Sequence, residues 1–513
     1  MKVTQKIFIF VTPEWLTKPE RKSRVRALAE KNLLTLIAVD EAHLIFDWEN
    51  FQPAFKDLQN LKFDFPTIPL MFATATATPD VEGNLRALLR NPFVSKGTVN
   101  RPNIELRVEE WSKSSSDPFK PFARRVSEII VDEPCIVYTD FIQDVGPILS
   151  AIRDLDISAV GYYGEMENRL KSEAHLKWKS GQVQVIVATK VFGMGIDRAD
   201  VHHIVRNGVP ESISSWAQEL GRAGRDGLPA TATILYNNED VQNAKSWIKN
   251  HLHNPPVRDG ILTEFSQVWR YIYADNAGQC RRKVLLSLFG EEESEAMSDG
   301  TCCDVCELNI SCSLECKAEL AKLLKALETL GGIGEVKLAE WLRGSNASWT
   351  NKCNKTYSSY GSGNHHSNNW WRNFARACHV HGLVNRKYKS IIKQSGHYAI
   401  QGIYWATDEG RKLLQNNGSL LLPECAQLDS SKSSEISVTV SQRSSDDAEK
   451  QTSKRIGKGS HGLSVVRKML SNSASWKQLR IKVLINSPEY SIKNDAVFIL
   501  YPGLYKVTTI CTR

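Results

Sequence analysis

The sequence predicts an α/β fold with two parallel-sheet lobes, followed by a helical, cysteine-rich subdomain and a basic helical module. Three observations lead to this prediction. Short apolar runs alternate with polar helical stretches over residues 1–105 and again over residues 117–245, which is typical of βα units. Four cysteines follow between residues 280 and 306. Residues 312–420 then contain 15 Lys and Arg and 7 Asp and Glu. Their excess positive charge, 15 − 7 = +8, equals the net charge of the whole chain.

The composition excludes some classes of protein. The 513 residues are 42% hydrophobic and 24% charged, as in ordinary globular proteins. No apolar run reaches the ~18–20 residues that a membrane span needs. The N-terminal run "IFIFV" is followed at once by Pro13 and Glu14, so it fits a strand better than a signal peptide. For an intracellular chain, the 11 cysteines indicate metal ligands or buried thiols rather than disulfides. The basic segment indicates a polyanion partner, with an ordinary solvated surface as the alternative.

The elements of the two lobes can be placed in order. In residues 1–105 the runs "IFIFV", "LLTLIAVD" and "IPLMFATA" are expected strands, and residues 50–61 and 79–90 are expected helices. Residues 106–116 leave this pattern and are expected to form a connector. In the second lobe, which we bound at residues 106–245, the expected strands are "PCIVYTDF", "ISAVGYY", "VQVIVATKVF", "VHHIVRNG" and "TATILYN".

The C-terminal half is less regular. We expect a zinc-binding subdomain over residues 246–310 and a basic module over residues 311–420. In the latter, residues 317–330 place five leucines on one helical face. Residues 421–513 are expected to be a disordered linker and an unassigned tail. Residues 426–460 are Ser-rich and charged, and the last 50 residues contain one plausible strand, "DAVFILY".

Two adjacent carboxylates end a predicted strand in "TLIAVDEAHLIF", residues 35–46. Ligands bind at strand ends in open α/β sheets, where Asp40 can hold Mg²⁺ and Glu41 can orient or deprotonate an attacking water. His43 could couple nucleotide state to the neighbouring lobe. By itself the tetrad is a weak signal, because a surface acidic turn gives the same letters.

Two further segments support a nucleotide site. "FATATATPD", residues 72–80, places small and hydroxyl side chains just past a strand, as a switch segment requires. It also reads as a helix start, with Thr78 as N-cap and Pro79 in the first helical position, and the two interpretations are compatible. "VATKVFGMGID" ends a strand with Gly193 and Gly195, where a partner approaches the backbone closely, and Asp197 follows.

The most specific segment is "SWAQELGRAGRDG", residues 215–227. Arg222 and Arg225 are three residues apart and would share one face of a helix. Their guanidinium groups could meet a γ-phosphate as charge develops on it. Gln218 lies one turn earlier and could sense the same phosphates. A solvated basic helix end is the alternative, but it leaves two closely spaced glycines of this segment unexplained.

With these segments in this order, the chain resembles the RecQ family of DNA helicases, in superfamily 2. The resemblance rests on "VDEAHLIFDW", "ATATATPD", "NRPNIEL", "IVATKVFGMGIDRADVHHIVR" and "QELGRAGRDG", and covers residues 7–415. "CRRKVLLSLFGE" and "CCDVC" resemble the Werner-type animal members. The resemblance implies two RecA-like lobes, a winged-helix module, ATP hydrolysis with Mg²⁺, 3′→5′ movement on single-stranded DNA, and residence in the nucleus.

The resemblance also implies residue roles. Asp40 and Glu41 would hold metal and water, Thr74 and Thr76 would belong to the coupling segment, Asp197 would bridge the lobes, and Arg222 and Arg225 would sense phosphate. The family's aromatic-rich coupling loop keeps Trp48 and Phe51, but here it is one residue shorter and lacks the family's His and Arg. "VYTDF", residues 137–141, replaces a pattern with Ser and Arg, so one DNA contact is expected to be missing.

The largest departure is the absence of a phosphate-binding loop. No G-x-x-x-x-G-K-[ST] string occurs in the 513 residues. The nearest string, "RIGKGSHG" at 455–462, has Lys458 followed by Gly459. The family's nucleotide-stacking glutamine motif is absent as well. We therefore expect an incomplete first lobe, from a truncated gene model or a natural short form, and little or no ATP hydrolysis.

The cysteines indicate zinc. Cys280, Cys302, Cys303 and Cys306 combine a Cys-x2-Cys pair with one distant cysteine, and Cys302 supplies the fourth thiolate. Buried free thiols are the alternative, and Cys312 and Cys316 are competing ligands. Arg281 and Arg282 are expected to pair with acids or DNA.

Residues 317–415 resemble the family's winged-helix module. Trp370, Trp371 and Phe374 are expected in its core. The predicted wing spans residues 385–410, with His397 or Tyr398 at its tip, where an aromatic ring could stack on a base and open a duplex end; an ordinary hairpin loop is equally compatible. Single-stranded and forked DNA are the expected partners. The phosphate contacts would come from Lys387, Lys389 and Lys393.

Overall fold

The computed structural model describes residues 7–47, 53–90, 92–112, 117–130, 133–192, 198–237, 255–291, 302–308, 312–392, 398–416, 418–423, 482–485, 496–500 and 509–511. All of them belong to one compact unit, formed by residues 1–429 and 480–513. Within these ranges, no helix combines the length and the apolar character required to cross a bilayer.

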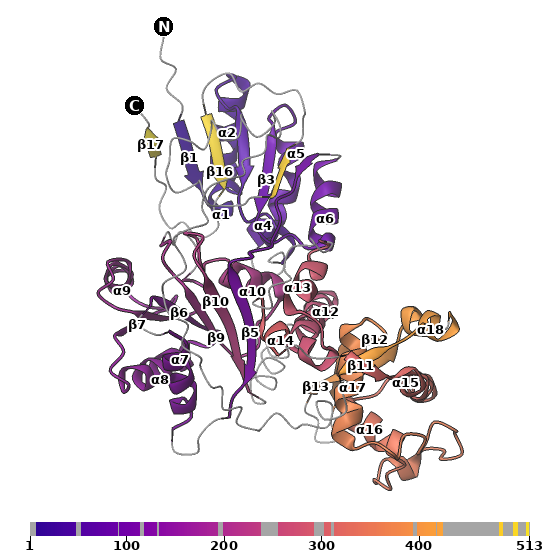
Figure 1. The fold of residues 1–513 in the computed structure, drawn as a ribbon. Helices are drawn as coiled ribbons and strands as arrows, with labels where there is room; N and C mark the ends of the chain where they lie inside the picture. Colours follow the sequence, from indigo (N-terminus) through magenta and orange to yellow (C-terminus); the bar gives the residue numbers. More distant parts are fainter. Residues whose placement is uncertain are drawn as a thin grey trace, which may run out of the picture. The chain divides into compact units, whose positions relative to one another are not determined.

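The first lobe is built on a seven-stranded sheet in the order β17-β1-β16-β2-β3-β15-β4 (Figure 1). Its strands are β1 (Ile7–Val11), β2 (Leu36–Val39), β3 (Leu70–Thr74), β4 (Phe93–Ser95), β15 (Lys482–Ile485), β16 (Ala496–Leu500) and β17 (Thr509–Cys511). β2 and β3 pair directly and in parallel. β16 lies between β1 and β2 and is parallel to both, whereas β15 runs antiparallel between β3 and β4. C-terminal strands thus complete a sheet whose other strands lie some 400 residues earlier.

This topology corrects the expectation for residues 421–513. The predicted strand "DAVFILY" is confirmed as β16, but β15 and β17 were not expected, nor was the pairing of all three with the first lobe. "KVLI" and "AVFIL" consist largely of apolar residues that favour strands. A parallel sheet buried on both faces uses such short apolar runs. The Ser-rich segment 426–460 lies outside the described residues.

Short helices surround the first sheet. They are α1 (Pro13–Leu16), α2 (Pro19–Glu30), α3 (Leu44–Asp47), α4 (Pro53–Asp57), η1 (Leu58–Asn60), α5 (Leu61–Asp64) and α6 (Pro79–Leu89). The predicted start of α6 is confirmed: Pro79 opens the helix and the Thr78 side chain accepts a hydrogen bond from the Val81 amide. Only four residues, 75–78, lie between the end of β3 and the start of α6. This short segment is therefore held at the carboxyl edge of the sheet.

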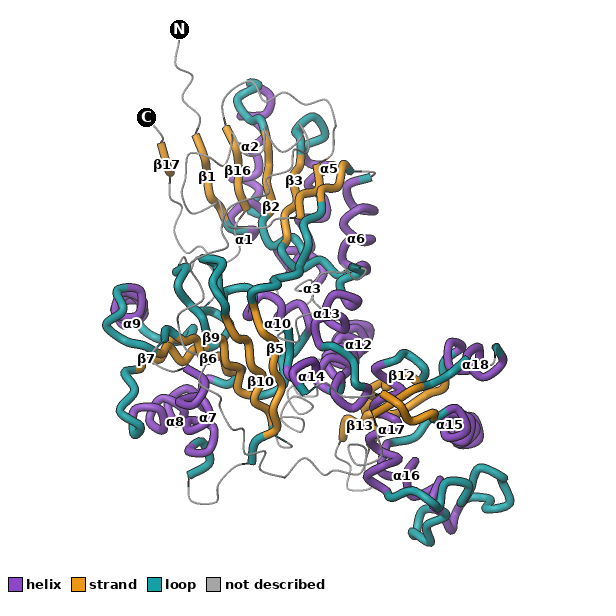
Figure 2. The backbone as a smooth tube through the Cα atoms, viewed as in Figure 1, coloured by secondary structure: helices purple, strands orange, loops and turns teal. Residues whose placement is uncertain are grey.

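The second lobe is a six-stranded parallel sheet in the order β5-β10-β9-β6-β8-β7 (Figure 2). Its strands are β5 (Ile104–Glu110), β6 (Cys135–Thr139), β7 (Ala159–Tyr162), β8 (Val185–Ala188), β9 (His203–Asn207) and β10 (Ala230–Tyr236). The expectation of a connector at 106–116 is wrong for its first half. Residues 106–110 belong to β5, in which Ile104, Leu106 and Val108 alternate as buried residues with more exposed polar ones.

The two faces of this sheet are covered by different helices. Cys135 and Val137 of β6 pack with α7 (Lys120–Ile130) and α8 (Ile142–Arg153), which lie side by side in Figure 2. Ile136 and Tyr138 point the other way, into a cluster that includes Trp178 of α9 (Asn168–Lys179) and Trp216 of α10 (Ile213–Leu220). The period of two along β6 therefore explains both layers.

A helical segment and a winged-helix module follow. The helical segment contains α12 (Pro255–Ile272), η2 (Ala274–Ala277), α13 (Arg281–Leu288) and α14 (Asp304–Glu307). The module contains β11 (Cys312–Glu315), α15 (Lys317–Leu330), α16 (Glu335–Arg343), η3 (Thr350–Lys352), α17 (Asn368–Val380), β12 (Val384–Ile392), β13 (Tyr398–Ala406), α18 (Asp408–Gln415) and β14 (Leu421–Pro423). The predicted helix at 317–330 and the predicted antiparallel wing, β12 with β13, are confirmed. Trp370, Trp371 and Phe374 are buried, as expected for core residues.

Candidate functional site

The two predicted carboxylates lie directly after β2. Asp40 Oδ1 accepts a hydrogen bond from the Glu41 amide at 2.9 Å. Glu41 has a φ of 50°, a left-handed conformation that is uncommon for residues with a side chain. Such strain persists only where the surroundings enforce it, and it occurs often at functional sites. The left-handed conformation of Glu41 turns the chain between β2 and α3. Asp40, Glu41 and His43 all lie in this turn, at the end of the strand.

Burial and neighbouring charges govern the protonation of this pair. Burial raises the pKa of Glu41 to about 7, and the Asp40 carboxylate also raises it, while Arg222 lowers it. Burial likewise raises the pKa of Asp40, opposed by the hydrogen bond from the Glu41 amide. A carboxyl group with a pKa near 7 can exchange a proton with water at neutral pH, as a general base must.

His43 is fixed in its neutral form. Complete burial lowers the pKa of its ring to about 4. Its Nδ1 lies 2.9 Å from Thr74 Oγ1, and its Nε2 lies 3.2 Å from the amide nitrogen of Gln218. Because an amide nitrogen only donates, Nε2 is the acceptor and Nδ1 carries the proton toward Thr74. His43 therefore connects the end of β3 to α10.

Gln218 brings the second lobe to these residues. Besides His43, its amide nitrogen lies 3.3 Å from Glu41 Oε2 and 3.3 Å from Thr76 Oγ1. One α10 turn earlier, the Ser214 hydroxyl donates to the Thr76 carbonyl oxygen at 3.4 Å. The structure thus brings together five predicted residues from three segments: Glu41, His43, Thr74, Thr76 and Gln218. The amide has two hydrogens for three acceptors, so it can exchange partners when Glu41 changes its proton.

The two arginines do not lie as expected. α10 ends at Leu220 with Gly221 as its C-cap, so Arg222 and Arg225 lie in the turn that follows, and the prediction that they share a helix face is wrong. Gly224 has a φ of 53°, and a Cβ there would lie 2.3 Å from the Asn103 side chain. These glycines end the helix. The electrostatic effect on Glu41 still places Arg222 near the carboxylates.

Two residues that sequence reasoning did not single out hold this turn. The Arg101 guanidinium donates to the carbonyl oxygens of Gly221, Ala223 and Gly224 at 3.0, 2.9 and 2.8 Å. The Asn103 amide donates to the Gly224 carbonyl oxygen at 2.9 Å. Both belong to "NRPNIEL", a segment that carries the family resemblance but to which no residue role was assigned.

Several predicted residues cannot be placed in the site. Gly195, Asp197, Trp48, Phe51 and Lys393 lie outside the described residues. Lys389 lies on β12 and Tyr398 opens β13, but their side chains are not described, and the candidate tip residue His397 is outside the described ranges. Lys387 is exposed on β12. The roles predicted for these residues stay predictions.

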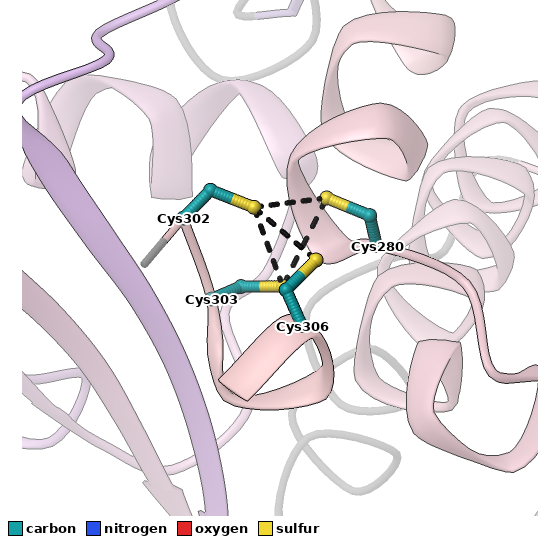
Figure 3. Close-up of side chains that lie close together, drawn as sticks. All are labelled: Cys280, Cys302, Cys303 and Cys306. Carbon is teal, nitrogen blue, oxygen red and sulfur yellow. Dashed lines mark hydrogen bonds between the residues drawn. The ribbon is translucent and has the colours of Figure 1, made fainter. Parts of the chain in front are cut away.

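The four predicted zinc ligands come together (Figure 3). The sulfur of Cys302 lies 3.3 Å from those of Cys280 and Cys306 and 3.9 Å from that of Cys303, and Cys303 lies 3.9 Å from Cys280. With a Zn–S bond of ~2.3 Å, a tetrahedral site needs sulfurs ~3.8 Å apart. The donor set and its spacing therefore fit Zn²⁺. Cys316 is buried but is not part of this group.

The arginines beside Cys280 form the support of this centre. Arg281 is fully buried and donates to both carboxylate oxygens of Asp304, at 2.6 and 2.9 Å, which ties α13 to α14. Arg282 is also buried and donates to the Arg101 carbonyl oxygen at 2.8 Å. Both arginines were expected to pair with acids or DNA. Arg281 pairs with an acid, whereas Arg282 binds main-chain oxygens instead. A four-cysteine site built this way would staple the segment 302–307 to α13.

Comparisons with known proteins agree with this architecture. Family models match three consecutive parts of the chain: "Helicase conserved C-terminal domain" at residues 123–227, "RecQ zinc-binding" at 238–307 and "RQC domain" at 313–429. The first match covers most of the second lobe, a RecA-like helicase lobe with a parallel sheet. The second contains all four clustered cysteines, and the third contains the winged-helix module.

Curated relatives extend the similarity. The chain is 31% identical over 326 residues to "ATP-dependent DNA helicase Q-like 2" of Arabidopsis thaliana, covering 62% of this chain and 44% of the relative. It is 34% identical over 314 residues to "Putative ATP-dependent DNA helicase Q1" of Caenorhabditis briggsae, covering 59% and 48%. It is 27% identical over 442 residues to "Bifunctional 3'-5' exonuclease/ATP-dependent helicase WRN" of Mus musculus, covering 81% and 30%. The chain spans half or less of the length of these relatives.

Proposed function

This chain belongs to the RecQ family of helicases, and we propose that its residues serve ATP-dependent unwinding of DNA with 3′→5′ polarity, in nuclear repair, recombination and replication, although these 513 residues by themselves hydrolyse little or no ATP because they contain no phosphate-binding loop. The observation on which this proposal depends is the contact of Gln218 with Glu41, His43 and Thr76. A side chain that touches the carboxylates, the histidine and the segment after β3 at once can report the state of a nucleotide from one lobe to the other.

In this proposal the residues act on water and phosphate. Asp40 holds Mg²⁺, which supplies charge neutralisation at the phosphates. Glu41 accepts a proton from the attacking water, for which a pKa of about 7 is suitable. Arg222, close enough to affect Glu41, stabilises the charge that develops on the γ-phosphate, with Arg225 beside it. Thr74 and His43 carry the change at Glu41 toward the end of β3.

A second candidate function is DNA binding without turnover. The observation that favours it is the sequence itself, since the 513 residues contain no G-x-x-x-x-G-K-[ST] loop to grip the triphosphate. The winged-helix hairpin and the zinc-stapled helices need no nucleotide to present a basic surface to forked DNA. We propose that a polypeptide of these 513 residues by itself works in this way, as a DNA-binding or regulatory form.

ATP turnover tests whether these 513 residues by themselves hold a working motor. A purified polypeptide of residues 1–513 is incubated with Mg-ATP and single-stranded DNA, beside its Glu41→Gln variant, which keeps the shape of the side chain and removes the base. We expect phosphate release from both at the same background rate, together with binding of forked DNA. Release that exceeds background and is abolished by Glu41→Gln would instead assign a working motor to these residues.

The DNA-binding part of the proposal has its own test. Lys387 is exposed on β12, in the half of the predicted wing nearer its base, where it pairs with Ile403 of β13. Lys387→Ala should weaken forked-DNA binding in a fluorescence anisotropy titration and lower the slope of log K against log salt by ~0.9 if it neutralises one phosphate. Lys179→Ala, an exposed lysine on α9, is the matched control and should change neither quantity. Equal effects of the two variants would argue against a phosphate contact on the wing.

A further inference from the structure

A second cluster of metal-ligand side chains lies in the winged-helix module, away from the four cysteines. It consists of Glu319 in the first turn of α15 and of His365 and His366 in the loop before α17. One ligand atom from each lies within 4.8 Å of those of the other two. The helicase function proposed above makes no use of these three residues.

The spacing of the ligand atoms suits a tetrahedral ion. Nε2 of His365 lies 3.5 Å from Glu319 Oε1, and Nε2 of His366 lies 3.9 Å from the same oxygen. With Zn–N and Zn–O bonds of ~2.0–2.1 Å, ligand atoms at the corners of a tetrahedron are ~3.3 Å apart. The two distances to Glu319 are therefore within a few tenths of an ångström of this value, and adjustment of the two imidazole rings would complete the geometry, with water in the fourth position.

The histidine loop is held before any ion binds. The amides of Gly361 and Gly363 donate to the carbonyl oxygens of Trp341 and Leu342, at 3.0 and 2.7 Å. The Trp371 indole donates to the Gly363 carbonyl oxygen at 2.7 Å. The His366 ring stacks on Trp370, with centroids 3.5 Å apart and planes 4° apart. Ligands fixed in this way lose little conformational freedom on binding, which favours affinity.

A lysine competes for the same place. Lys322, one turn after Glu319, has its Nζ 3.6 Å from Glu319 Oε1 and 3.4 Å from His365 Nε2. When no ion is bound, the ammonium group of Lys322 supplies the positive charge beside the Glu319 carboxylate. A bound cation would supply that charge instead. Lys322 is on the helix surface and can swing into water, so it lowers the affinity for an ion without blocking the site.

We propose that Glu319, His365 and His366 form a second zinc site, which ties the start of α15 to the loop before α17. Two imidazoles and one carboxylate suit Zn²⁺ better than Mg²⁺ or Ca²⁺, which prefer oxygen ligands. The site differs from the four-cysteine centre in its ligand chemistry, because it contains no sulfur. Its occupancy depends on the free zinc concentration and on competition from Lys322.

The test measures zinc per chain in the full-length protein, dialysed against buffered free zinc, for the wild type and three variants. His365→Ala with His366→Ala removes two ligands, Lys322→Met removes the competitor, and His175→Ala removes a histidine of α9 as a control. Cobalt replaces zinc in a second series, because cobalt bound by imidazole and carboxylate gives no sulfur charge-transfer band, whereas cobalt at the four cysteines does.

We expect two zinc ions per wild-type chain and one per double-histidine variant, with His175→Ala unchanged. Lys322→Met should fill the second site at a lower zinc concentration, and the second cobalt ion should add no sulfur band. One zinc per chain in both the wild type and Lys322→Met would overturn the proposal. So would a second ion that persists in the double-histidine variant, since that ion must bind elsewhere.

Discussion

At the scale of single residues, the proposed nucleotide site depends on where carboxylates are buried. Glu41 is held in a left-handed turn beside Asp40, and no ion pair of the described residues pairs it with an arginine or lysine. Its proton affinity is therefore set by burial and by Asp40, against a smaller effect of Arg222. A carboxylate in the same lobe behaves in the opposite way. Burial raises the pKa of Glu82, but hydrogen bonds from Lys96 and Arg86 outweigh it and leave that pKa below its usual value.

These opposite shifts predict opposite effects on stability. The pKa of Glu41 is about 7 in the folded chain and 4.5 in the unfolded chain. The contribution of Glu41 to the free energy of unfolding is therefore fully present below pH 4.5 and is lost as the pH rises through 7. Glu41→Gln should therefore stabilise the first lobe at pH 8 by about 1–2 kcal/mol, allowing for partial exposure, and by almost nothing at pH 4.5. This change in the stability of the first lobe is measured by denaturant unfolding, followed by hydrogen exchange in β1–β3.

Glu82→Gln provides the control of opposite sign. Its lowered folded pKa contributes stability above pH 4.5, so the substitution should destabilise the lobe at pH 8. If Glu41→Gln also destabilised the first lobe at pH 8, the raised pKa of Glu41 would be contradicted.

The residue-level site was only partly predictable. "DEAH" after an apolar run was enough to place Asp40 and Glu41 at a strand end. The contact between Gln218 and Glu41 joins positions 177 residues apart, and no local pattern encodes it. Arg101 lies in the quoted segment "NRPNIEL", but its role was not predicted, because the carbonyl oxygens that it binds belong to a turn about 120 residues later.

At the scale of elements, short apolar strands and capped helices were predicted well. β6, β8 and β9 follow from their Val- and Ile-rich runs, and the start of α6 follows from Thr78 and Pro79. β5 was mistaken for a connector because its charged residues alternate with buried ones at the edge of the sheet. The end of α10 was missed because the three-residue spacing of Arg222 and Arg225 was taken to continue the helix, which instead ends at Leu220.

The strands at the C-terminus make the most testable claim about elements. β16 pairs with β1 on one side and β2 on the other, so a proline within it must break at least one ladder. Ile499→Pro removes an N–H group from the ladder and should cost the first sheet about 1–3 kcal/mol. We expect faster amide exchange in β1 and β2, measured by mass spectrometry. Ala448→Pro, between the two parts of the sheet in sequence, is the matched control. Unchanged exchange in β1 and β2 of Ile499→Pro would contradict the pairing.

At the scale of the whole molecule, the net charge of residues 312–420 overstates how many of their basic side chains are available at the surface. Three of the arginines in residues 312–420 face Glu335 inside the winged-helix module: Arg376 at 2.9 Å, Arg372 at 3.1 Å and Arg386 at 3.8 Å. Although burial opposes it, these charges lower the pKa of Glu335 to about 2. Arg386 also lies over the rings of Trp269 and Tyr273, which join the module to the helices beside the zinc centre. Part of the excess charge is thus structural, and the lysines of the wing become the stronger candidates for phosphate contacts.

The central claim for the whole molecule is that both lobes share one site, with carboxylates on one wall and Gln218 and Arg222 on the other. The Ser214 hydroxyl of α10 lies 3.4 Å from the Thr76 carbonyl oxygen, and the Thr76 hydroxyl lies 3.3 Å from the Gln218 amide nitrogen one turn later, so we expect cysteines at positions 76 and 214 to come within cross-linking distance. A chain with Thr76→Cys and Ser214→Cys is mildly oxidised and digested, and cross-linked peptides are identified by mass spectrometry. Thr76→Cys with Ser172→Cys, a serine exposed on α9, is the control. The account predicts a 76–214 cross-link and no 76–172 cross-link. A folded 76–214 variant that stays reduced at these two positions under the same oxidation would contradict it.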